Sequence, residues 1–377
     1  MDLSNPLITL MDNYEKTGFA MSLAFHPNGL MIAVGYENNI VNIWKNDGKW
    51  NLIQSLVPKR SNTRKFIQTL AFNNNYLVSG DTRGKIKIWS TASWVREEIS
   101  SKSQSHTQAI NGIAFNGTEN SFASVSDDNK ILIWKRDEST LTWSVVKEIY
   151  LYNNKLLSNK IKCVSFRVDG KYLLYGITNS VQVMETTNWK IEGLPNLTLS
   201  NGNNVYSIAT SPDKKYIAVG TDQENILIWK PNSEIEMTKN VQTLYKNQNV
   251  EKSIIRSVVF STDSKYMVAS CGQANKIIIF KNGNGDKWDK LIEYNFEEEV
   301  FGIAFSPDGK TLAVALSNGE VKLYSFEPTN DPDPIPPRSN QIGGKKKNRS
   351  TRKSKRSSSK RSSNKRSSSK RKTKKRI

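Results

Sequence analysis

Short apolar runs alternate with polar turns from residue 22 to residue 324, and the same order of runs recurs seven times. Each unit has a first apolar run that usually ends in Phe, a turn rich in Pro, Asp or Gly, a second run, and a third that ends in an aromatic residue or Met. Successive third runs end 45, 45, 50, 45, 51 and 44 residues apart, a period that predicts a repeat architecture. The units span Ser22–Trp44, Ile67–Trp89, Ile110–Trp134, Ile161–Met184, Val205–Trp229, Ile255–Phe280 and Val300–Tyr324.

Within the units, the apolar positions follow the two-residue period of β-strands. Lys85–Trp89 alternates lysines with apolar residues, and Val321–Tyr324 has the same pattern, which differs from the 3.6-residue period of a helix. The first and second runs are separated by tight turns such as His26–Gly29 and Ser306–Lys310. Proline presets φ in such turns and glycine accepts positive φ, so neighbouring strands are predicted to pair as hairpins.

Each third strand is followed by one more amphipathic stretch, which gives four strands per unit of about 45 residues. The clearest of these stretches are Trp50–Val57, Trp94–Ser100, Trp143–Leu151 and Trp288–Phe296. Four strands per repeat is the count of a β-propeller blade. The sequence therefore predicts an all-β, seven-bladed β-propeller.

The seventh unit lacks its fourth strand because prolines follow Tyr324 closely. An apolar stretch, Pro6–Met11, precedes the first unit and belongs to no other blade. We expect this N-terminal segment to supply the missing outer strand, which closes the ring and removes its open edges. The predicted domains are a propeller over residues 1–326, a Pro-rich linker over 327–344, and a disordered tail over 345–377.

Over residues 6–326 the chain resembles the WD-repeat family of seven-bladed propellers, with a degenerate signature. Members of that family end the third strand in Trp-Asp, whereas Trp is followed here by Lys45, Ser90, Lys135 and Lys230. The Gly-His dipeptide of the family is absent, although the third repeat keeps one histidine in its place.

The resemblance implies that the third repeat contains a structural hydrogen-bond tetrad of His106, Ser124, Asp128 and Trp134. Such a network satisfies buried polar groups and joins the strands of one blade. The alternative is that His106 is a solvated loop residue. Other blades have Asn38, Arg83 or Gln223 at the aspartate position, so they are expected to depend on apolar packing and strand pairing.

Composition argues against catalysis and against a metal or cofactor site. The only histidines, His26 and His106, belong to different repeats, and no phosphate loop or nucleophile motif is present. Cys163 and Cys271 fall in strands of different blades and are expected to be small core residues. Without a signal-like segment or an apolar run of membrane-spanning length, an intracellular protein is predicted.

The formal net charge of +20 resides almost entirely in the last forty residues. Arg338–Ile377 contains 19 Lys or Arg and no Asp or Glu; removing these from the 55 basic residues leaves 36, against 35 acidic ones. The ring region therefore has a net charge of only +1. Attraction for polyanions is predicted to belong to the tail.

The tail repeats a Lys-Arg-Ser-Ser-Ser pattern and contains no aromatic residue, so it cannot bury enough surface to fold. Three roles remain open: solubility, nonspecific binding to nucleic acid through counterion release, and nuclear import. Phosphorylation of the nine serines in Ser354–Ser369 would add about −1.5 to −2 each and nearly cancel its charge. The candidate nucleic-acid or import cluster is Lys370, Arg371, Lys372, Lys374, Lys375 and Arg376.

Binding residues on a propeller concentrate on the loops of its faces, and the resemblance implies docking of proteins or peptides there. A basic loop enters the second blade, and the acidic Glu297–Glu299 enters the seventh, so one face should carry a positive and a negative sector. The alternative for the basic loop is a solubilising surface. The candidate partner-binding residues are Lys59, Arg60, Arg64 and Lys65.

The function favoured by these features is a noncatalytic scaffold whose basic tail binds nucleic acid or another polyanion, or directs nuclear import. The first alternative is a nucleic-acid condensing or packaging protein in which the tail is primary, and a weaker third is a propeller hydrolase or lyase. The Lys- and Asn-rich composition with a Lys/Arg/Ser ending also resembles WD-repeat proteins from AT-rich genomes, including those of large DNA viruses.

Overall fold

The computed structural model describes residue 3 and residues 5–11, 18–57, 65–100, 105–117, 120–151, 160–189, 197–199, 203–223, 225–230, 241–246, 253–283 and 287–326. The regular elements in these ranges are all β-strands. The predicted linker and tail lie outside the described residues, so their boundaries stay predictions. Among the described residues, no helix has the length and apolar character needed to cross a membrane.

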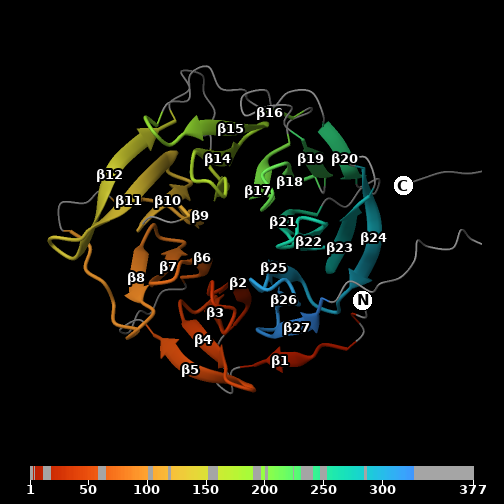
Figure 1. Ribbon diagram of the computed structural model, residues 1–377, viewed down its shortest axis with the longest axis horizontal. Helices are drawn as coiled ribbons and strands as arrows, with labels where there is room; N and C mark the ends of the chain where they lie inside the picture. Colours follow the sequence, from red (N-terminus) through yellow and green to blue (C-terminus); the bar gives the residue numbers. More distant parts are fainter. Residues whose placement is uncertain are drawn as a thin grey trace, which may run out of the picture. The chain divides into compact units, whose positions relative to one another are not determined.

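Seven small antiparallel sheets, the blades, surround a common centre, and the first strand of each repeat unit lies innermost (Figure 1). Blade 1 contains β2 (Ala20–Phe25), β3 (Met31–Tyr36), β4 (Val41–Asn46) and β5 (Trp50–Leu56). Blade 2 contains β6 (Ile67–Phe72), β7 (Tyr76–Asp81) and β8 (Ile86–Ser90). Blade 3 contains β9 (Ile110–Phe115), β10 (Ser121–Ser126), β11 (Lys130–Asp137) and β12 (Thr142–Tyr150).

Blades 4 to 7 repeat this arrangement, and the last one includes the N-terminal strand. Blade 4 contains β13 (Cys163–Phe166), β14 (Tyr172–Ile177), β15 (Ser180–Glu185) and β16 (Leu197–Thr198), and blade 5 contains β17 (Val205–Thr210), β18 (Ile217–Thr221), β19 (Asn225–Trp229) and β20 (Val241–Lys246). Blade 6 contains β21 (Ile255–Phe260), β22 (Tyr266–Cys271), β23 (Lys276–Asn282) and β24 (Trp288–Asn295). Blade 7 contains β25 (Val300–Phe305), β26 (Thr311–Leu316), β27 (Val321–Ser325) and β1 (Ile8–Leu10).

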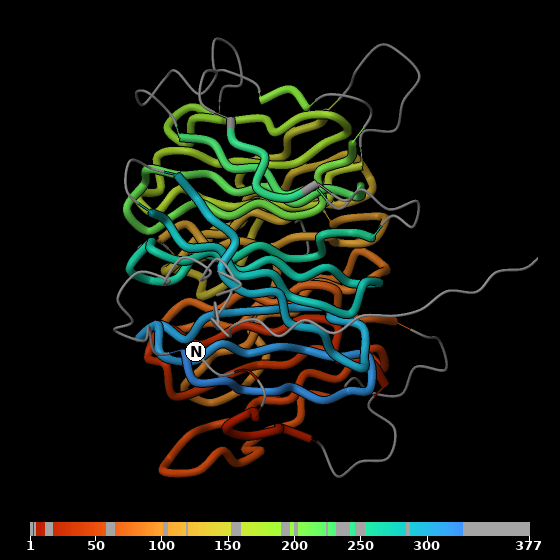
Figure 2. The backbone as a smooth tube through the Cα atoms, turned by 90° about the vertical axis from the view of Figure 1, so that its right-hand side faces the viewer, coloured from red at the N-terminus to blue at the C-terminus, as the bar shows by residue number. Residues whose placement is uncertain are grey.

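The ring closes through β1, as predicted. Leu10 lies opposite Val321 and Ile8 opposite Leu323 in an antiparallel pair, and the Leu7 N–H donates to the Leu323 carbonyl at 2.8 Å. The red N-terminal strand lies beside the blue last blade in Figure 1, and the first and last blades are neighbours in Figure 2. Two segments from opposite ends of the ring sequence thus complete one sheet.

The predicted fourth strand over Trp94–Ser100 is wrong, because the sheet of blade 2 has three strands among the described residues. This segment makes one bridge to β8, between Arg96 and Trp89, and then pairs with the neighbouring blade, where Ile99 bridges Trp143. The Trp143 indole is fully buried, and Ile99 packs against the same apolar cluster. Apolar burial therefore draws the segment away from its own sheet.

The predicted turns after the first strands form as expected. In the first, Gly29 has φ 74° and donates its N–H to the His26 carbonyl at 2.9 Å. In the fifth, Lys214 takes the same position with φ 65°. A small Ser-Asp motif braces several of these turns, as where the Ser261 hydroxyl donates to Asp263 at 2.6 Å. These bonds fix the hairpins that define each blade.

The core of the protein lies between blades. Buried apolar side chains of the described residues form seven clusters, and each combines strands of two neighbouring blades. The cluster that joins blades 7 and 1 contains Leu10, Ala20 and Ala315. Cys163 and Cys271 are buried free thiols in β13 and β22, as expected, and burial raises the pKa of the Cys163 thiol.

Close approach between blades requires small residues on the second strand. A Cβ on Gly220 would lie against the Ile255 side chain of the next blade, well within 3.0 Å. The same collision with the first β-branched residue of the following inner strand would occur at Gly35, Gly80 and Gly176. The β-branched residue at the start of most units is therefore the one that fills the space left by a glycine.

Gly220→Ala should destabilise the fold by about 1–3 kcal/mol, because the added methyl overpacks the boundary between blades 5 and 6. Gly302→Ala is the matched control, since the nearest atoms to its new Cβ are 3.8 Å away. Its free energy of unfolding should change little. Urea unfolding of both variants checks this, and equal effects would contradict a steric role for Gly220.

Leu10→Ala should destabilise the ring by about 2–5 kcal/mol, because it opens a cavity at the closing strand. Leu10 is 2% exposed, whereas Leu7 in the same segment is 62% exposed, so Leu7→Ala should have a much smaller effect. Thermal and urea unfolding measure both. If the two substitutions cost the same, β1 does not seal the ring through its buried side chain.

Candidate functional site

The four residues of the expected tetrad come together inside blade 3. His106 Nδ1 lies 3.0 Å from Asp128 Oδ2 and His106 Nε2 lies 2.8 Å from Ser124 Oγ. The Trp134 indole N–H donates to the same Ser124 oxygen at 2.9 Å. Since a carboxylate only accepts, His106 donates through Nδ1. The network links the loop before β9 to β10 and β11.

Ser124, His106 and Asp128 have the order of hydrogen bonds found in a nucleophilic triad, but their surroundings prevent catalysis. Ser124 is fully buried, and the side chains of His106 and Asp128 are 0% and 3% exposed. The indole N–H of Trp134 donates a hydrogen bond to the same serine oxygen. A substrate has no route to this oxygen, so the network holds the blade together.

Asp128 also receives backbone hydrogen bonds from Thr107 and Lys130, at 2.9 and 3.1 Å. Burial by itself raises the pKa of the Asp128 carboxyl. The hydrogen bond and the charge of His106, together with the two backbone N–H groups, outweigh burial and leave the pKa below its usual range. The carboxylate form is therefore the one that the fold stabilises.

Blades 1 and 2 lack the tetrad and use hydrogen bonds within a single turn, in addition to the apolar packing that the sequence predicts. In blade 2, Asp81 Oδ1 accepts from the Arg83 and Lys85 N–H groups at 2.9 and 3.0 Å. In blade 1, Asn38 accepts from Ile40 at 3.2 Å. The Trp44 indole N–H is buried with no hydrogen-bond partner among the described residues, because Val34 stands at the position that Ser124 takes in blade 3.

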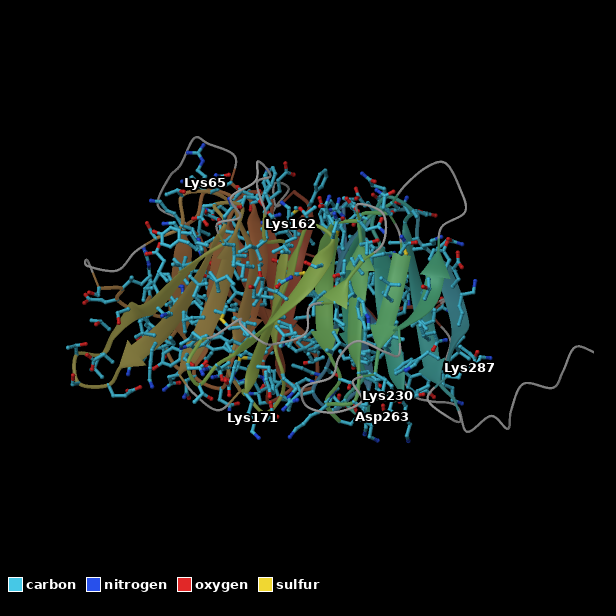
Figure 3. All side chains as sticks on the ribbon, turned by 90° about the horizontal axis from the view of Figure 1, so that it is seen from above. Lys65, Lys162, Lys171, Lys230, Asp263 and Lys287 are labelled. Atoms are coloured by element: carbon cyan, nitrogen blue, oxygen red, sulfur yellow. The ribbon has the colours of Figure 1, made fainter. Side chains whose placement is uncertain are left out.

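Lys65 is the described member of the candidate partner-binding set, and Lys59, Arg60 and Arg64 lie outside the described residues. Lys65 lies on the same face of the ring as Lys162, whereas Lys171, Lys230, Asp263 and Lys287 lie on the opposite face (Figure 3).

The expected negative sector of this face is partly neutralised within the protein. Arg256 binds Glu299 at 2.7 Å, and the Ser317 hydroxyl donates to Glu298 at 2.7 Å. These two carboxylates are therefore already engaged by their own ring.

The same face carries a belt of cationic and aromatic side chains near the starts of the inner strands. The Arg256 guanidinium lies 4.5 Å from the Phe301 ring centre, and Phe301 stacks on Phe19 at 5.7 Å. Lys162 lies 5.9 Å from the Tyr206 ring centre. This arrangement offers aromatic surface with fixed charges beside it.

Asp127 fixes one side of the belt, since it binds Lys162 at 2.7 Å and accepts from the Asn111 amide at 2.7 Å. Sequence reasoning did not single out these residues. A signal was present, because Lys162, Tyr206 and Arg256 each directly follow the β-branched residue at the start of a unit. Aligning the units on that residue identifies the belt.

A groove of about 520 Å³ lies between blades 1 and 2. Gln54–Val57, at the end of the outer strand of blade 1 and directly after it, forms one wall, and the third strand of blade 2 forms the other. In the described part of the chain, none of the four cations in its lining makes an ion pair. The charged lining residues are Lys65, Asp81, Lys85, Lys87 and Arg96.

Lys87 is partly buried in this groove, and its Nζ donates to Asn39 Oδ1 of blade 1 at 3.5 Å. Burial lowers the pKa of Lys87; Asp81 opposes this change, and the positive charges of Arg96, Lys65 and Lys85 add to it. Asp81 Oδ2 is buried without a hydrogen-bond partner among the described residues. The groove therefore contains an excess of positive charge.

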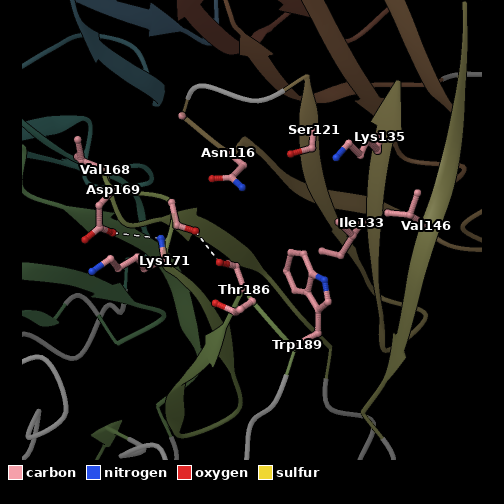
Figure 4. A pocket seen from close by; sticks show the side chains of 13 residues that line it. Asn116, Ser121, Ile133, Lys135, Val146, Val168, Asp169, Lys171, Thr186 and Trp189 are labelled. Atoms are coloured by element: carbon pink, nitrogen blue, oxygen red, sulfur yellow. Dashed lines mark hydrogen bonds between the residues drawn. The ribbon is translucent and has the colours of Figure 1, made fainter. Parts of the chain in front are cut away.

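A second groove, of about 610 Å³, lies between blades 3 and 4 and includes Trp189, Lys135 and Lys171 (Figure 4). Its polar groups are largely engaged with each other, since Thr186 donates to the Gly170 carbonyl at 2.7 Å and Asp169 accepts from the Lys171 N–H at 3.2 Å. Nowhere in the described ranges do three His, Cys, Asp or Glu side chains gather as a metal-binding set.

Comparison with family models identifies two kinds of match in this chain. The model described as WD domain, G-beta repeat, matches residues 5–45, 98–135 and 194–230. The model described as anaphase-promoting complex subunit 4 WD40 domain matches residues 287–331. The matched segments cover the first, third, fifth and seventh repeats.

Among curated proteins, the chain is similar to Protein hir1 of Schizosaccharomyces pombe, with 25% identity over 331 residues, 82% of this chain and 30% of that protein. It is 29% identical over 133 residues to cell division cycle 20.1, cofactor of APC complex, of Arabidopsis thaliana, covering 34% of this chain and 28% of that protein. The matches thus span less than a third of either relative.

Among solved structures, the ring is similar to the β-propeller domain of Myceliophteria thermophila Cps50 (Swd1), with a TM-score of 0.67, 17% identity, and coverage of 85% of this chain and 100% of that one. A chain of the mitotic checkpoint complex gives a TM-score of 0.65 at 18% identity, covering 86% of this chain and 95% of that one. These likenesses show the fold.

Asp128→Asn should lower the free energy of unfolding at pH 7 by about 1–3 kcal/mol, because a buried charge-assisted network is weakened. Since the pKa of Asp128 is lowered in the folded state, its contribution is complete above about pH 3.9 and lost as the pH falls through the folded-state pKa. The difference between variant and parent should therefore shrink below that pH in urea unfolding.

Asp289→Asn is the control for this experiment, because Asp289 is 60% exposed and its ion-pair partner among the described residues is the exposed Lys287. It should have little effect at any pH. A difference between Asp128→Asn and the parent that stays constant down to pH 3 would contradict the role given to the Asp128 carboxylate.

Proposed function

Because this chain is a WD40-repeat protein folded as a seven-bladed β-propeller, we propose that its ring is a platform for protein partners and that its basic tail attaches the assembly to polyanions. WD40 propellers are typically noncatalytic scaffolds that bind proteins, and this chain is one of them. The observation that carries the finer proposal is the contrast between a ring of net charge +1 and a tail of net charge +19.

The absence of a reactive arrangement at the histidines supports the scaffold function. His106 is enclosed in the tetrad, and His26 contacts the Asn74 carbonyl at 3.1 Å and the Phe72 ring at the boundary of blades 1 and 2. Both imidazoles are buried. Neither is placed to exchange protons with a substrate.

The ring offers two kinds of protein-binding surface. The belt around Arg256 and Phe301 presents aromatic rings beside fixed charges, a composition common at the centres of interfaces. The basic loop residues Lys59, Arg60, Arg64 and Lys65 are proposed to bind an acidic partner or a phosphate group. Opposite charge at this face would speed association more than it strengthens the complex.

The tail is proposed to bind nucleic acid or another polyanion without sequence preference, and its terminal cluster from Lys370 to Arg376 to act in nuclear import. Each Lys or Arg that neutralises a phosphate releases a counterion, so affinity should fall steeply with salt. The absence of aromatic residues in the tail argues against base stacking. Phosphorylation of its serines would weaken this binding.

The names of the relatives are consistent with a place in larger assemblies. One relative is named as a cofactor of the APC complex, and one structural neighbour comes from the mitotic checkpoint complex. The alternative function, in which the tail condenses or packages nucleic acid, is favoured by the tail's charge alone.

Removing residues 330–377 should abolish salt-sensitive binding to a DNA or RNA duplex and leave the protein partners of the ring unchanged. The full chain and the shortened chain are compared by fluorescence anisotropy at several salt concentrations and by affinity purification with mass spectrometry. Loss of the protein partners along with the tail would favour the packaging function and contradict the scaffold.

The same assay tests the serine hypothesis. Aspartate at the nine serines from Ser354 to Ser369 should weaken duplex binding, whereas alanine at the same positions should leave it unchanged. Equal binding by the two variants would show that phosphorylation does not control the tail.

A further inference from the structure

Blade 2 leaves part of its sheet edge unpaired. Arg96 bridges Trp89, and the Glu97 N–H donates to the Ile88 carbonyl at 2.8 Å. Beyond this bond the chain turns to blade 3, where the Trp143 N–H donates to the Glu98 carbonyl at 2.9 Å and the Ser100 N–H to the Trp143 carbonyl at 2.8 Å. The outer-strand position next to the start of β8 is therefore unpaired among the described residues.

Ile86 presents its backbone groups to this unpaired edge. On the inner side of β8, the Asp81 N–H donates to the Lys85 carbonyl at 3.1 Å, and Gly80 lies opposite Ile86. Backbone groups of successive residues in a strand point to alternate sides. The Lys85 and Lys87 groups therefore face β7, while the Ile86 N–H and C=O face outward into the groove that this residue lines.

Successive side chains of β8 point to opposite faces of the sheet. Ile86 and Ile88 belong to the apolar cluster shared with blade 3, whereas Trp89 belongs to the cluster shared with blade 1. Lys85 and Lys87 share the parity of Trp89, and all three line the groove toward blade 1. Arg96 lies opposite Trp89 and adds a further cation to the same side.

We propose that an extended acidic segment of a partner protein binds in the groove between blades 1 and 2, pairs with the outward backbone groups of Ile86, and places anionic side chains on alternate residues beside Lys85, Lys87 and Arg96. The inference deepens the proposed scaffold function and rests on it. Strand addition of this kind takes affinity from the backbone and specificity from alternate side chains.

Charge complementarity decides the occupant. The groove contains four cations and one carboxylate, that of Asp81, so its net charge is +3 when all are ionised. The chain's own tail is cationic and would be repelled. Alternate residues in an extended segment are about 6.6–6.8 Å apart. Lys85, directly before β8, and Lys87 within it are two residues apart, so anions on every second residue match the two lysines.

The direct probe is a fluorescent seven-residue peptide of alternating valine and glutamate, measured by anisotropy against the full chain. The residue opposite Ile86 places its side chain on the Ile86 side of the sheet, so a valine occupies that position and the glutamates face the lysines. N-methylation of the valines should weaken binding about tenfold, because the N–H groups facing β8 are lost. N-methylation of the glutamates should leave binding unchanged.

Substitution of the groove separates it from the tail, which also attracts acidic peptides. Lys87→Met with Arg96→Met should weaken peptide binding about five- to tenfold while keeping the apolar stems of both side chains. Lys171→Met, on the opposite face, is the matched control and should have no effect. A glutamine version of the peptide should bind weakly to all these proteins.

If N-methylation of the valines and of the glutamates weakened peptide binding equally, or if neither weakened it, the strand pairing would be overturned. Equal binding by the groove variant and the Lys171→Met control would overturn the site. If the peptide fails to bind while the ring retains its protein partners, this inference falls and the scaffold function stands. The N-methylated peptides use the unaltered chain, so the outcome does not depend on the folding of a variant.

Discussion

The fold depends on close packing between neighbouring blades. Every apolar cluster of the described residues combines two blades, so a single blade has no core of its own. Gly220 permits the Ile255 side chain to approach the preceding sheet, and the Ser207 hydroxyl donates to the Ile255 carbonyl across the same boundary at 3.0 Å. Stability therefore arises from contacts that exist only when the ring is complete.

This constraint explains both ends of the ring. Leu10 must reach the cluster between blades 7 and 1 because a ring with an unfilled position would expose apolar surface and a strand edge. It also explains why blade 2 differs from the others. Ile99 leaves the sheet of blade 2 to pack with Trp143, and the edge at Ile86 remains unpaired beside a cationic groove. A gain in packing at one boundary thus leaves a binding surface at the next.

The ring positions charge in a way that net charge does not reveal. Acidic and basic residues nearly cancel over residues 1–337, yet Lys65, Lys85, Lys87 and Arg96 gather at one boundary with a single carboxylate. Elsewhere charges are engaged internally, as between Arg256 and Glu299. Burial also matters at the tetrad. Ser124, His106 and Asp128 are hydrogen-bonded in the order of a catalytic triad, but the Ser124 oxygen is enclosed by His106 and Trp134, so the network has a structural role.

From the sequence alone one could predict the seven repeats, the first three strands of each, the closing segment at Pro6–Met11 and the core positions of both cysteines, because these follow from periodicity and local turn chemistry. It also indicated which four residues of blade 3 to compare with a known tetrad. The three-dimensional arrangement was needed to show that Glu98–Ser100 pairs with blade 3 and that Lys65 lies in one groove with Lys87 and Arg96. The first contact depends on competition between two blades for the same segment, and the second on which residues meet at a boundary between blades; local propensity carries no information about either.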